Sequence, residues 1–230
     1  MTASRKLVVA IDGPAGSGKS TIAARLAKKL GYVNLESGAM YRALALKALE
    51  TDVGLDDAED LRNLALSSTI DLEPEGDGNR VLLDGRDVSQ RIRDADVTVA
   101  ASRVSVHPRV RQVMVARQRA LGTHGGVVME GRDIGTAVFP KAEVKVFLDA
   151  DPHIRAERRL RQTALTSPRD ARRLRSEIAD RDERDRTRRS SPLVPAPDAV
   201  VLDTTHLNID DVVAAVYRLV QQRLETKHPA

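Results

Sequence analysis

The sequence lacks cysteine and tryptophan altogether, and its 230 residues include only two phenylalanines and three tyrosines. Without cysteine, the chain has no disulfide, no thiolate metal site and no cysteine nucleophile. No run of about 18 apolar residues is present, so no segment is predicted to span a membrane. The polar N-terminus lacks the long apolar core of a signal peptide, and the expected location is therefore cytoplasmic.

Basic charge is concentrated in one segment. Lysine and arginine number 37 against 33 acidic residues, but residues 155–189 alone hold 13 arginines, no lysine and 7 acidic residues. Because this segment has no aromatic residue on which a base could stack, no nucleic-acid partner is expected. An arginine cluster suits discrete phosphate groups, which the guanidinium fork holds in a fixed orientation. The alternative is a solvated helix face, and composition alone favours that alternative.

Short apolar runs alternate with segments of helical periodicity along most of the chain. This alternation predicts an α/β fold with a mostly parallel sheet flanked by helices. The predicted strands cover 7–12, 32–36, 127–130, 144–149 and 200–203. The predicted helices cover 20–30 (ended by Gly31), 39–50, 56–67, 108–121 and 209–224 (N-capped by Asn208). Turn residues predict a small antiparallel hairpin inserted near 70–88.

The segment after the first predicted strand matches the phosphate-binding pattern G-x-x-x-x-G-K-[ST]. Its residues are Gly13, Pro14, Ala15, Gly16, Ser17, Gly18, Lys19 and Ser20, followed by Thr21. Glycines let backbone N–H groups surround a phosphate, and the start of the next helix adds its positive end. We expect Lys19 to reach the β- and γ-phosphates of ATP and the Ser20 hydroxyl to ligate Mg²⁺.

This loop predicts binding of a nucleoside triphosphate without specifying the reaction. Asp149 ends an apolar run and is either a second magnesium ligand or a cap for the helix that begins near Pro152. Capping is the interpretation that we rank higher. No N-K-x-D motif for guanine is present, and the chain is too short for a helicase-type motor core, so a GTPase and a helicase are not expected.

Polar clusters follow the predicted strands, at the sheet edge where ligands bind in such folds. One runs from Ser37 to Arg42 and another from Glu130 to Asp133. In the run 181–188, helical spacing places three arginines and one aspartate on one face. They are Arg181, Arg184, Asp185 and Arg188. Internal ion pairing on a solvated helix is the alternative, but beside a nucleotide loop phosphate binding is the better interpretation.

Several segments together carry a resemblance to a known family. They are IDGPAGSGKST, ESGAMYR, AASRVSVHPRVR, GRDIGTAVFP, VKVFLDA, RDERDR and PLVPA, and they run from Ile11 to Ala196. The chain thereby resembles the bacterial cytidylate (CMP) kinases, of the nucleoside-monophosphate kinase group of P-loop phosphotransferases. One departure is Glu36, where the enteric motif begins with Asp.

The resemblance implies a single kinase unit in three parts. These are a core (1–36, 105–154 and 190–230), an acceptor-binding part (37–104) that carries the hairpin insert, and a short helical lid with the arginine-rich helix (155–189). It further implies phosphoryl transfer from ATP to CMP and dCMP, with Mg²⁺ as cofactor, in pyrimidine nucleotide metabolism. The expected partners are these small molecules alone, with no nucleic acid and no membrane, and the expected state is a monomer.

The resemblance also assigns roles by position. The residues expected to read cytosine are Ser37, Ser102, Arg111 and Asp133. Those expected to hold the acceptor phosphate are Arg42, Arg132 and Arg188, while Arg181 and Asp185 would address the ribose and the nearby phosphate. Arg158 and Arg159 would lie in the lid over ATP, and the residues expected to act in catalysis are Lys19, Arg132, Arg158 and Arg188.

The chemistry of the expected base contact is coherent. The amino group of cytosine suits a carboxylate, whereas the carbonyl of uracil would face an ionised Asp133 with lone pair against lone pair. CMP and dCMP are therefore expected to be preferred over UMP. One alternative is a kinase of the same fold that acts on a hydroxyl such as that of shikimate, with Asp133 as base. The other is a non-catalytic, ATP-gated nucleic-acid-binding module, whose binding would depend steeply on salt.

Overall fold

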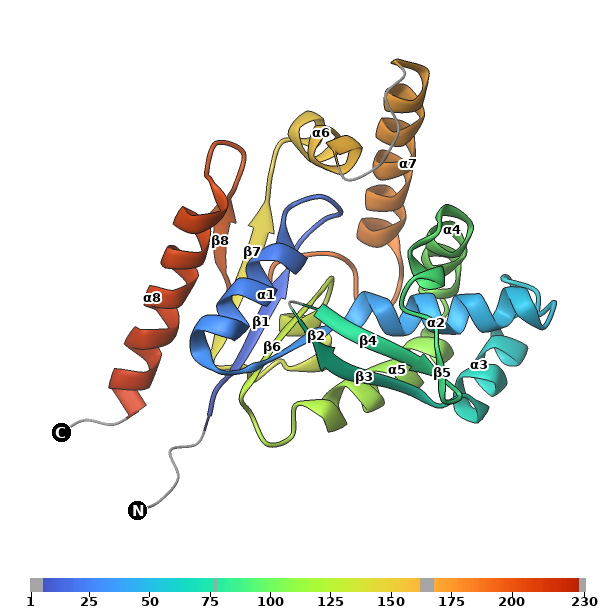
Figure 1. The fold of residues 1–230 in the computed structure, drawn as a ribbon, viewed down its shortest axis with the longest axis horizontal. Coiled ribbons are helices and arrows are strands. Elements are labelled where there is room, and N and C mark those ends of the chain that lie inside the picture. The colour runs from blue at the N-terminus through green and yellow to red at the C-terminus, as the bar shows by residue number, and fades with distance from the viewer. Residues whose placement is uncertain (1–5, 77, 162–167, 228–230) are drawn as a thin grey trace.

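The computed structural model describes residues 6–76, 78–161 and 168–227. Its centre is a five-stranded sheet in the order β2-β6-β1-β7-β8, and every neighbouring pair is parallel (Figure 1). The strands are β1 (Val8–Asp12), β2 (Val33–Glu36), β6 (Val127–Gly131), β7 (Val144–Asp149) and β8 (Val200–Asp203). Helices flank this sheet on both faces, so the predicted α/β architecture is confirmed.

Alternate side chains of β1 enter two separate hydrophobic cores, one on each face of the sheet. Val9 and Ile11 pack in the core with α1 (Lys19–Leu30) and α8 (Ile209–Lys227). Ala10 belongs to the other core, together with α2 (Ser37–Glu50) and α5 (Pro108–Leu121). Burial on both faces explains why these strands are continuous apolar runs in the sequence.

The sequence signals for helix ends are confirmed. Gly31 ends α1 in the left-handed conformation, at φ 65°. The side chain of Asn208 accepts a hydrogen bond from the N–H of Asp211 at 2.9 Å and so caps α8. Asp57 caps the acidic helix α3 (Ala58–Ser67) by accepting from two backbone N–H groups of its first turn.

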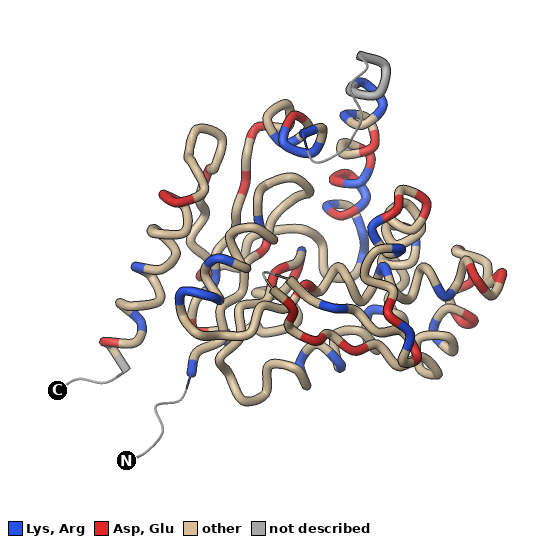
Figure 2. The backbone as a smooth tube through the Cα atoms, viewed as in Figure 1, with Lys and Arg blue, Asp and Glu red and all other residues tan. Residues whose placement is uncertain are grey.

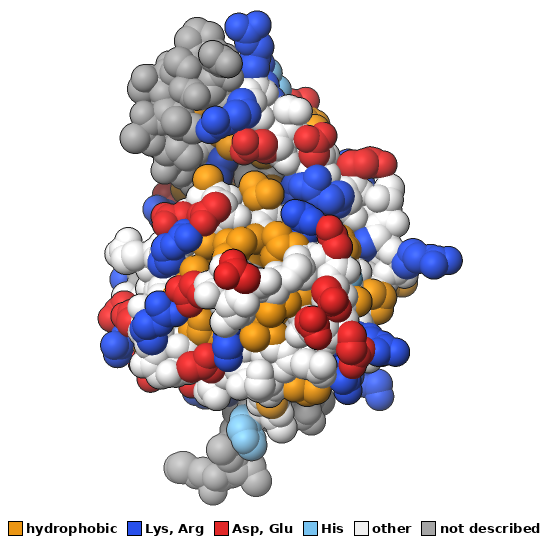
Figure 3. Space-filling view, turned by 90° about the vertical axis from the view of Figure 1, so that its right-hand side faces the viewer, with side chains coloured by type: hydrophobic (Ala, Val, Ile, Leu, Met, Phe, Trp, Pro, Cys, Tyr) orange, Lys and Arg blue, Asp and Glu red, His pale blue; other side chains and the backbone are white. Residues whose placement is uncertain are grey.

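The inserted segment forms a second, antiparallel sheet of β3 (Ile70–Glu75), β4 (Gly78–Leu83) and β5 (Arg86–Asp87). The predicted hairpin is thus confirmed, with β5 as an additional short strand. Buried Asn79 accepts from the N–H of Glu36 at 3.0 Å and donates to the carbonyl of Asn34 at 2.8 Å. These bonds hold the small sheet against the end of β2. On the face seen in Figure 3, hydrophobic side chains are bordered by acidic and basic ones.

Besides β5, three short elements have no counterpart among the predicted ones. The turn η1 (Arg91–Arg93) and helix α4 (Ala95–Val104) lie between the small sheet and α5. Helix α4 has only ten residues and mixes Thr and Ser with its apolar positions, so its periodicity is weak. A single π-helical turn, η2 (Ile134–Val138), follows β6, and such turns are frequent at functional sites.

The arginine-rich segment forms α6 (Pro152–Arg161) and α7 (Pro168–Thr187). Charges of both signs succeed one another along α7 (Figure 2). The helix ends at Thr187, so the prediction that Arg188 belongs to it is wrong, although the N–H of Arg188 still bonds to the Arg184 carbonyl at 3.1 Å. Within the described residues, no helix is both long and apolar enough to cross a membrane.

Candidate active site

Residues 13–20 form a tight loop between β1 and α1, as the motif predicts. Gly13, Gly16 and Gly18 have φ values of 146°, 77° and 93°, which favour glycine. At Gly13 space is limiting as well, because a Cβ there would lie 2.0 Å from the carbonyl oxygen of Leu148 at the end of β7. The loop therefore approaches the sheet as closely as a bare backbone allows.

Lys19 is buried in the first turn of α1. Its Nζ donates to the Pro14 carbonyl at 2.6 Å and lies 3.4 Å from the Ser17 hydroxyl. Burial, followed by the charge of Arg132, lowers the pKa of Lys19 to about 7. The ammonium group thus lies folded over its own loop, where phosphate oxygens would replace its two partners.

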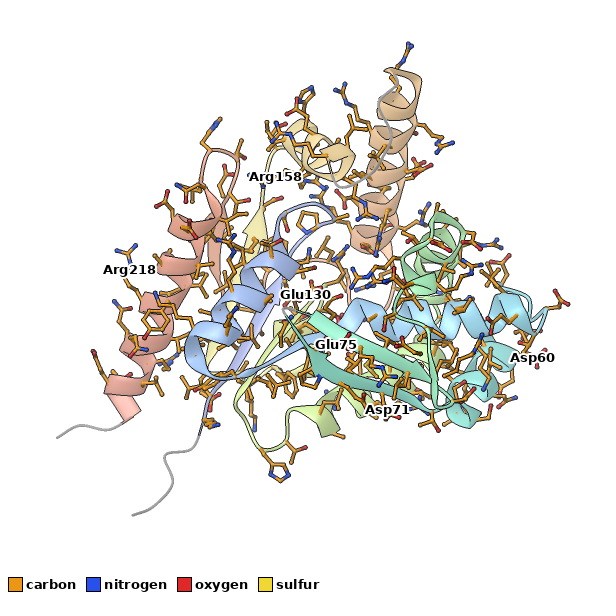
Figure 4. The ribbon with its side chains drawn as sticks, in the orientation of Figure 1. Asp60, Asp71, Glu75, Glu130, Arg158 and Arg218 are labelled. Atoms are coloured by element: carbon orange, nitrogen blue, oxygen red, sulfur yellow. The ribbon has the colours of Figure 1, made fainter. Side chains whose placement is uncertain are left out.

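Ser20 faces Glu130, at the end of β6. The Ser20 hydroxyl donates to Oε1 of Glu130 at 3.0 Å, and Figure 4 shows Glu130 beside α1, in the centre of the molecule. A hydroxyl and a carboxylate are oxygen ligands of the kind that Mg²⁺ takes in nucleotide sites. We assigned no role to Glu130 from the sequence, because the sequence does not show that β6 lies next to β1.

The sequence also gives no sign of a role for Asp12. This residue ends β1, and its carboxylate accepts hydrogen bonds from the N–H groups of Ile134 and Gly135, both at 2.7 Å. Burial raises the pKa of Asp12 to about 6. These bonds hold the start of the π-helical turn and so fix the backbone directly after Asp133.

The capping role predicted for Asp149 is wrong. Its Oδ1 accepts from the N–H of the next residue, Ala150, at 2.9 Å. Helix α6 is capped instead by Asp151, which accepts from the N–H of His153 at 2.8 Å. The proline at the first position of α6 shifts the cap to the residue directly before it.

Arginines and aspartates from three distant segments converge beside the phosphate loop. Nε of Arg132 donates to Asp185 at 2.9 Å, and the guanidinium of Arg188 lies 3.7 Å from both Asp185 and Asp133. Arg111, on α5, donates to Asp133 in a pair whose side chains are almost fully buried. The predicted acceptor residues of these segments therefore meet in one place.

Arg181 joins the same cluster. Its Nε lies 4.0 Å from Asp185, and burial, with Arg132 next in importance, lowers the pKa of Arg181 to about 10. Several donors here are buried but make no hydrogen bond within the described part of the chain. They are Nε of Arg42, Nε of Arg111, Nε of Arg181 and Nη2 of Arg188. Each of these arginines lies within 4.0 Å of a carboxylate, but a buried donor that makes no hydrogen bond is still costly, so these free donors indicate an anionic ligand.

The start of α2 adds Ser37 and Arg42 to this region. The Ser37 hydroxyl donates to the Glu130 carbonyl at 2.8 Å, and Arg42 lies 3.4 Å from the carboxylate of Glu36. Burial, and then the charge of Glu130, raise the pKa of Glu36. Ser102 also reaches the cluster, because its hydroxyl accepts a hydrogen bond from Nε of Arg184 at 3.1 Å.

Arg158 and Arg159, the two arginines predicted for the lid, differ in their contacts and exposure. Arg158 donates to the hydroxyl and the carbonyl of Thr204, at 3.0 and 2.6 Å, above the end of β7 (Figure 4). Arg159 is exposed, but its charge contributes to lowering the pKa of Arg42 and of Arg181. Arg158 is thus joined to the loop after β8, whereas Arg159 acts on the acceptor cluster through its charge.

A sequence model described as Cytidylate kinase matches residues 9–222. The chain belongs to the cytidylate kinase family. The family resemblance carried by the motifs is therefore confirmed, and so is the conclusion that the chain is a P-loop kinase of nucleoside monophosphates.

The similarity to curated relatives extends over nearly the whole chain. The cytidylate kinase of Enterococcus faecalis (strain ATCC 700802 / V583) is 50% identical over 219 residues, 95% of this chain and 97% of its own. That of Geobacillus kaustophilus (strain HTA426) is 49% identical over 221 residues, 96% of this chain and 99% of its own. Among solved structures, a gluconokinase from Sinorhizobium meliloti 1021 covers 97% of this chain and 96% of its own, with a TM-score of 0.48 and 15% identity, too distant to bear on function.

Proposed function

We propose that the chain transfers the γ-phosphoryl group of ATP to CMP, giving ADP and CDP, and that it accepts dCMP in the same way. The observation that carries the proposal is the set of buried guanidinium donors without hydrogen-bond partners on Arg42, Arg181 and Arg188. Membership in the cytidylate kinase family supports the choice of CMP as acceptor.

The donor end of the site is the phosphate loop. Its backbone N–H groups and the start of α1 suit the β-phosphate of ATP, and Lys19 suits the oxygens between the β- and γ-phosphates. The hydroxyl of Ser20 and the carboxylate of Glu130, 3.0 Å apart, fit Mg²⁺ when water and phosphate oxygens complete its shell. Bound there, Mg²⁺ would neutralise charge on the β- and γ-phosphates.

The acceptor end begins at the arginine cluster. Arg42, Arg132 and Arg188 would hold the phosphate of CMP, and the free donors on Arg42 and Arg188 are those that this phosphate would satisfy. Arg181 and Asp185, on α7, would address the ribose and the nearby phosphate. The roles of these residues stay predictions until a complex is examined.

Asp133 and Arg111 suit the base of the acceptor. An ionised carboxylate accepts from the amino group of cytosine, while Arg111, Ser37 and Ser102 offer donors to its ring nitrogen and carbonyl. Arg111 donates a hydrogen bond to this carboxylate within a buried ion pair. This pair would therefore reject UMP, whose carbonyl brings a lone pair towards the carboxylate.

The reaction needs no general base. A phosphate oxygen of CMP is already ionised near pH 7, since the second pKa of such a group is about 6. This oxygen forms the new bond to the γ-phosphorus as the bond from that phosphorus to the bridging oxygen of ADP breaks. Lys19, Arg132 and Arg188 would stabilise the charge that develops, and catalysis then consists of alignment and electrostatic stabilisation.

The three-part organisation follows from this chemistry as a proposal. The core holds ATP, the part formed by 37–104 presents CMP, and the segment 155–189 closes over both so that water does not take the phosphoryl group. A monomer, a cytoplasmic location and the absence of a nucleic-acid partner stay predictions from the sequence.

A coupled ADP-release assay across nucleoside monophosphates tests the function. We expect rapid turnover with CMP and dCMP, weak turnover with UMP, and loss of activity when divalent cations are chelated. Chromatography should identify the product as CDP. ADP release that requires shikimate or another alcohol, or no turnover with any monophosphate, would contradict the proposal.

A further inference from the structure

Two buried side chains from the lid segment bind both peptide groups of a single residue in the phosphate loop. Asp182, on α7, accepts a hydrogen bond from the N–H of Ala15 at 3.4 Å. Arg155, on α6, donates to the carbonyl of the same Ala15 at 3.0 Å. The two side chains also bond to each other, from Nη1 of Arg155 to Oδ2 of Asp182 at 2.5 Å.

Both side chains of this pair are buried. The side chains of Arg155 and Asp182 are 3% and 5% exposed. Nε of Arg155 donates to the carbonyl of Ala150 at 3.0 Å, and this bond joins α6 to the residue directly after β7. The backbone of α6 also abuts the loop, because a Cβ at Gly16 would lie 2.8 Å from the carbonyl oxygen of Arg155.

A buried ion pair is a poor source of stability, because desolvation offsets much of the attraction between its charges. Its geometry, however, fixes the groups that it bonds. Here the fixed group is the tip of the loop that surrounds the triphosphate, and the groups that fix it come from two helices of the lid segment.

We propose that Arg155 and Asp182 are positioning residues for the phosphate donor, which hold the Ala15 peptide groups so that the loop presents its N–H groups to ATP in the reactive orientation. No hydrogen bond of the described residues joins the pair to the arginine cluster or to Asp133, and the charge of Asp182 is only the last in order among the causes that raise the pKa of Arg132. Its loss therefore weakens binding and use of ATP, and leaves the binding of CMP intact. This inference rests on the proposed function, because it assigns ATP to the loop.

Two variants separate positioning from folding. Asp182→Asn keeps the size of the side chain, but its amide cannot pair with the Arg155 guanidinium as a carboxylate does. The double variant Arg155→Met with Asp182→Leu removes both charges together, a change that buried ion pairs often tolerate without loss of stability. The double variant loses both side-chain bonds to Ala15, and Asp182→Asn loses the ion pair that holds these two side chains in place. The matched control is Asp198→Asn, which removes the carboxylate partner of buried Lys145, 2.8 Å away and outside the site.

The measurements are the dissociation constants of AMP-PNP and of CMP by calorimetry, the thermal midpoint, and kcat/KM for each substrate. We expect AMP-PNP affinity and kcat/KM for ATP to fall at least about tenfold in both variants, since displacements of about 1 Å at a reacting group are that costly. In both variants the dissociation constant of CMP should stay within about twofold of wild type. For the Asp198→Asn control, both dissociation constants and both kcat/KM values should stay within the same range.

Unchanged AMP-PNP affinity in either folded variant would overturn the proposal. An equal loss of AMP-PNP and CMP affinity together with a lower thermal midpoint, or failure of both variants to fold, would assign the pair to folding alone and overturn it too. Failure of the proposed function would look different, because then the wild-type protein itself would not bind AMP-PNP or turn over CMP.

Discussion

Nε of Arg132 donates a hydrogen bond to Asp185 at 2.9 Å, although the two residues are 53 positions apart in the chain. Arg132 follows β6 of the central sheet, and Asp185 lies near the end of α7. The bond therefore joins the edge of the sheet to the arginine-rich helix. It also neutralises one of several cations that would otherwise repel one another in the space beside the phosphate loop.

Arg188→Ala should remove a guanidinium group that is buried and has a free donor at Nη2. We expect kcat/KM for CMP to fall about 100-fold or more, the cost of losing one charged donor to a transition state. The far-UV spectrum should be unchanged. The neighbouring Arg189→Ala, at an exposed position, is the control and should retain wild-type kcat/KM. Equal activity of the two variants would remove Arg188 from the site.

Asp133→Asn should relax the choice of base. An amide can donate to the carbonyl of uracil as well as accept from the amino group of cytosine. The ratio of kcat/KM for CMP to that for UMP should therefore fall about 10- to 100-fold, in line with the discrimination of a good hydrogen-bond pair. Steady-state kinetics with both monophosphates measure the ratio, and a ratio equal to that of the wild type would contradict the base contact.

ATP binding should take up a proton through Lys19. Burial holds the pKa of this ammonium group at about 7 in place of its ordinary 10.5, and triphosphate oxygens would raise it. Above pH 7 the free protein therefore lacks the proton that the complex holds, and ATP affinity should fall as the pH rises. Below pH 7 the group is already charged, and affinity should change little.

Calorimetry near pH 8 in two buffers of different ionisation enthalpy measures this proton directly. Lys19→Arg is the control, because a guanidinium stays protonated at every pH used. Its binding enthalpy should not depend on the buffer. Wild-type binding without any buffer dependence would show that Lys19 keeps its proton in the free protein.

Gly13→Ala should be far more damaging than Gly31→Ala. Both glycines have positive φ, at 146° and 65°, so each substitution strains the backbone by about 1–2 kcal/mol. Only at Gly13 does the new Cβ meet backbone, 2.0 Å from the Leu148 carbonyl oxygen, whereas nothing lies within 4 Å at Gly31. Chemical denaturation should show the larger loss of unfolding free energy for Gly13→Ala, and equal losses would contradict the close packing of the loop.

The sequence was sufficient for the regular parts of this fold. Val144–Asp149, for example, is a strand that is buried on both faces, and such a strand can be recognised from its nearly continuous run of apolar residues. It was insufficient where a role depends on which strands are neighbours. Glu130 meets Ser20 only because β6 pairs with β1 in parallel register, a long-range fact with no local signal.

The same limit applies to the arginine-rich segment. Its composition predicted phosphate binding, but Arg155 and Asp182 looked like the many exposed charges around them. Only the fold shows that these two side chains are buried against Ala15. Conversely, Asp149 looked like a helix cap, and Asp151 takes that role because Pro152 is the first residue of α6.

A crystal structure with CMP and AMP-PNP bound tests the central claim most directly. We expect guanidinium nitrogens of Arg132, Arg181 and Arg188 within about 3 Å of phosphate oxygens, the distance of charge-assisted hydrogen bonds. The two nucleotides should meet with their phosphates facing each other beside Lys19. A structure in which both nucleotides are bound while these three side chains point to bulk solvent would contradict the account.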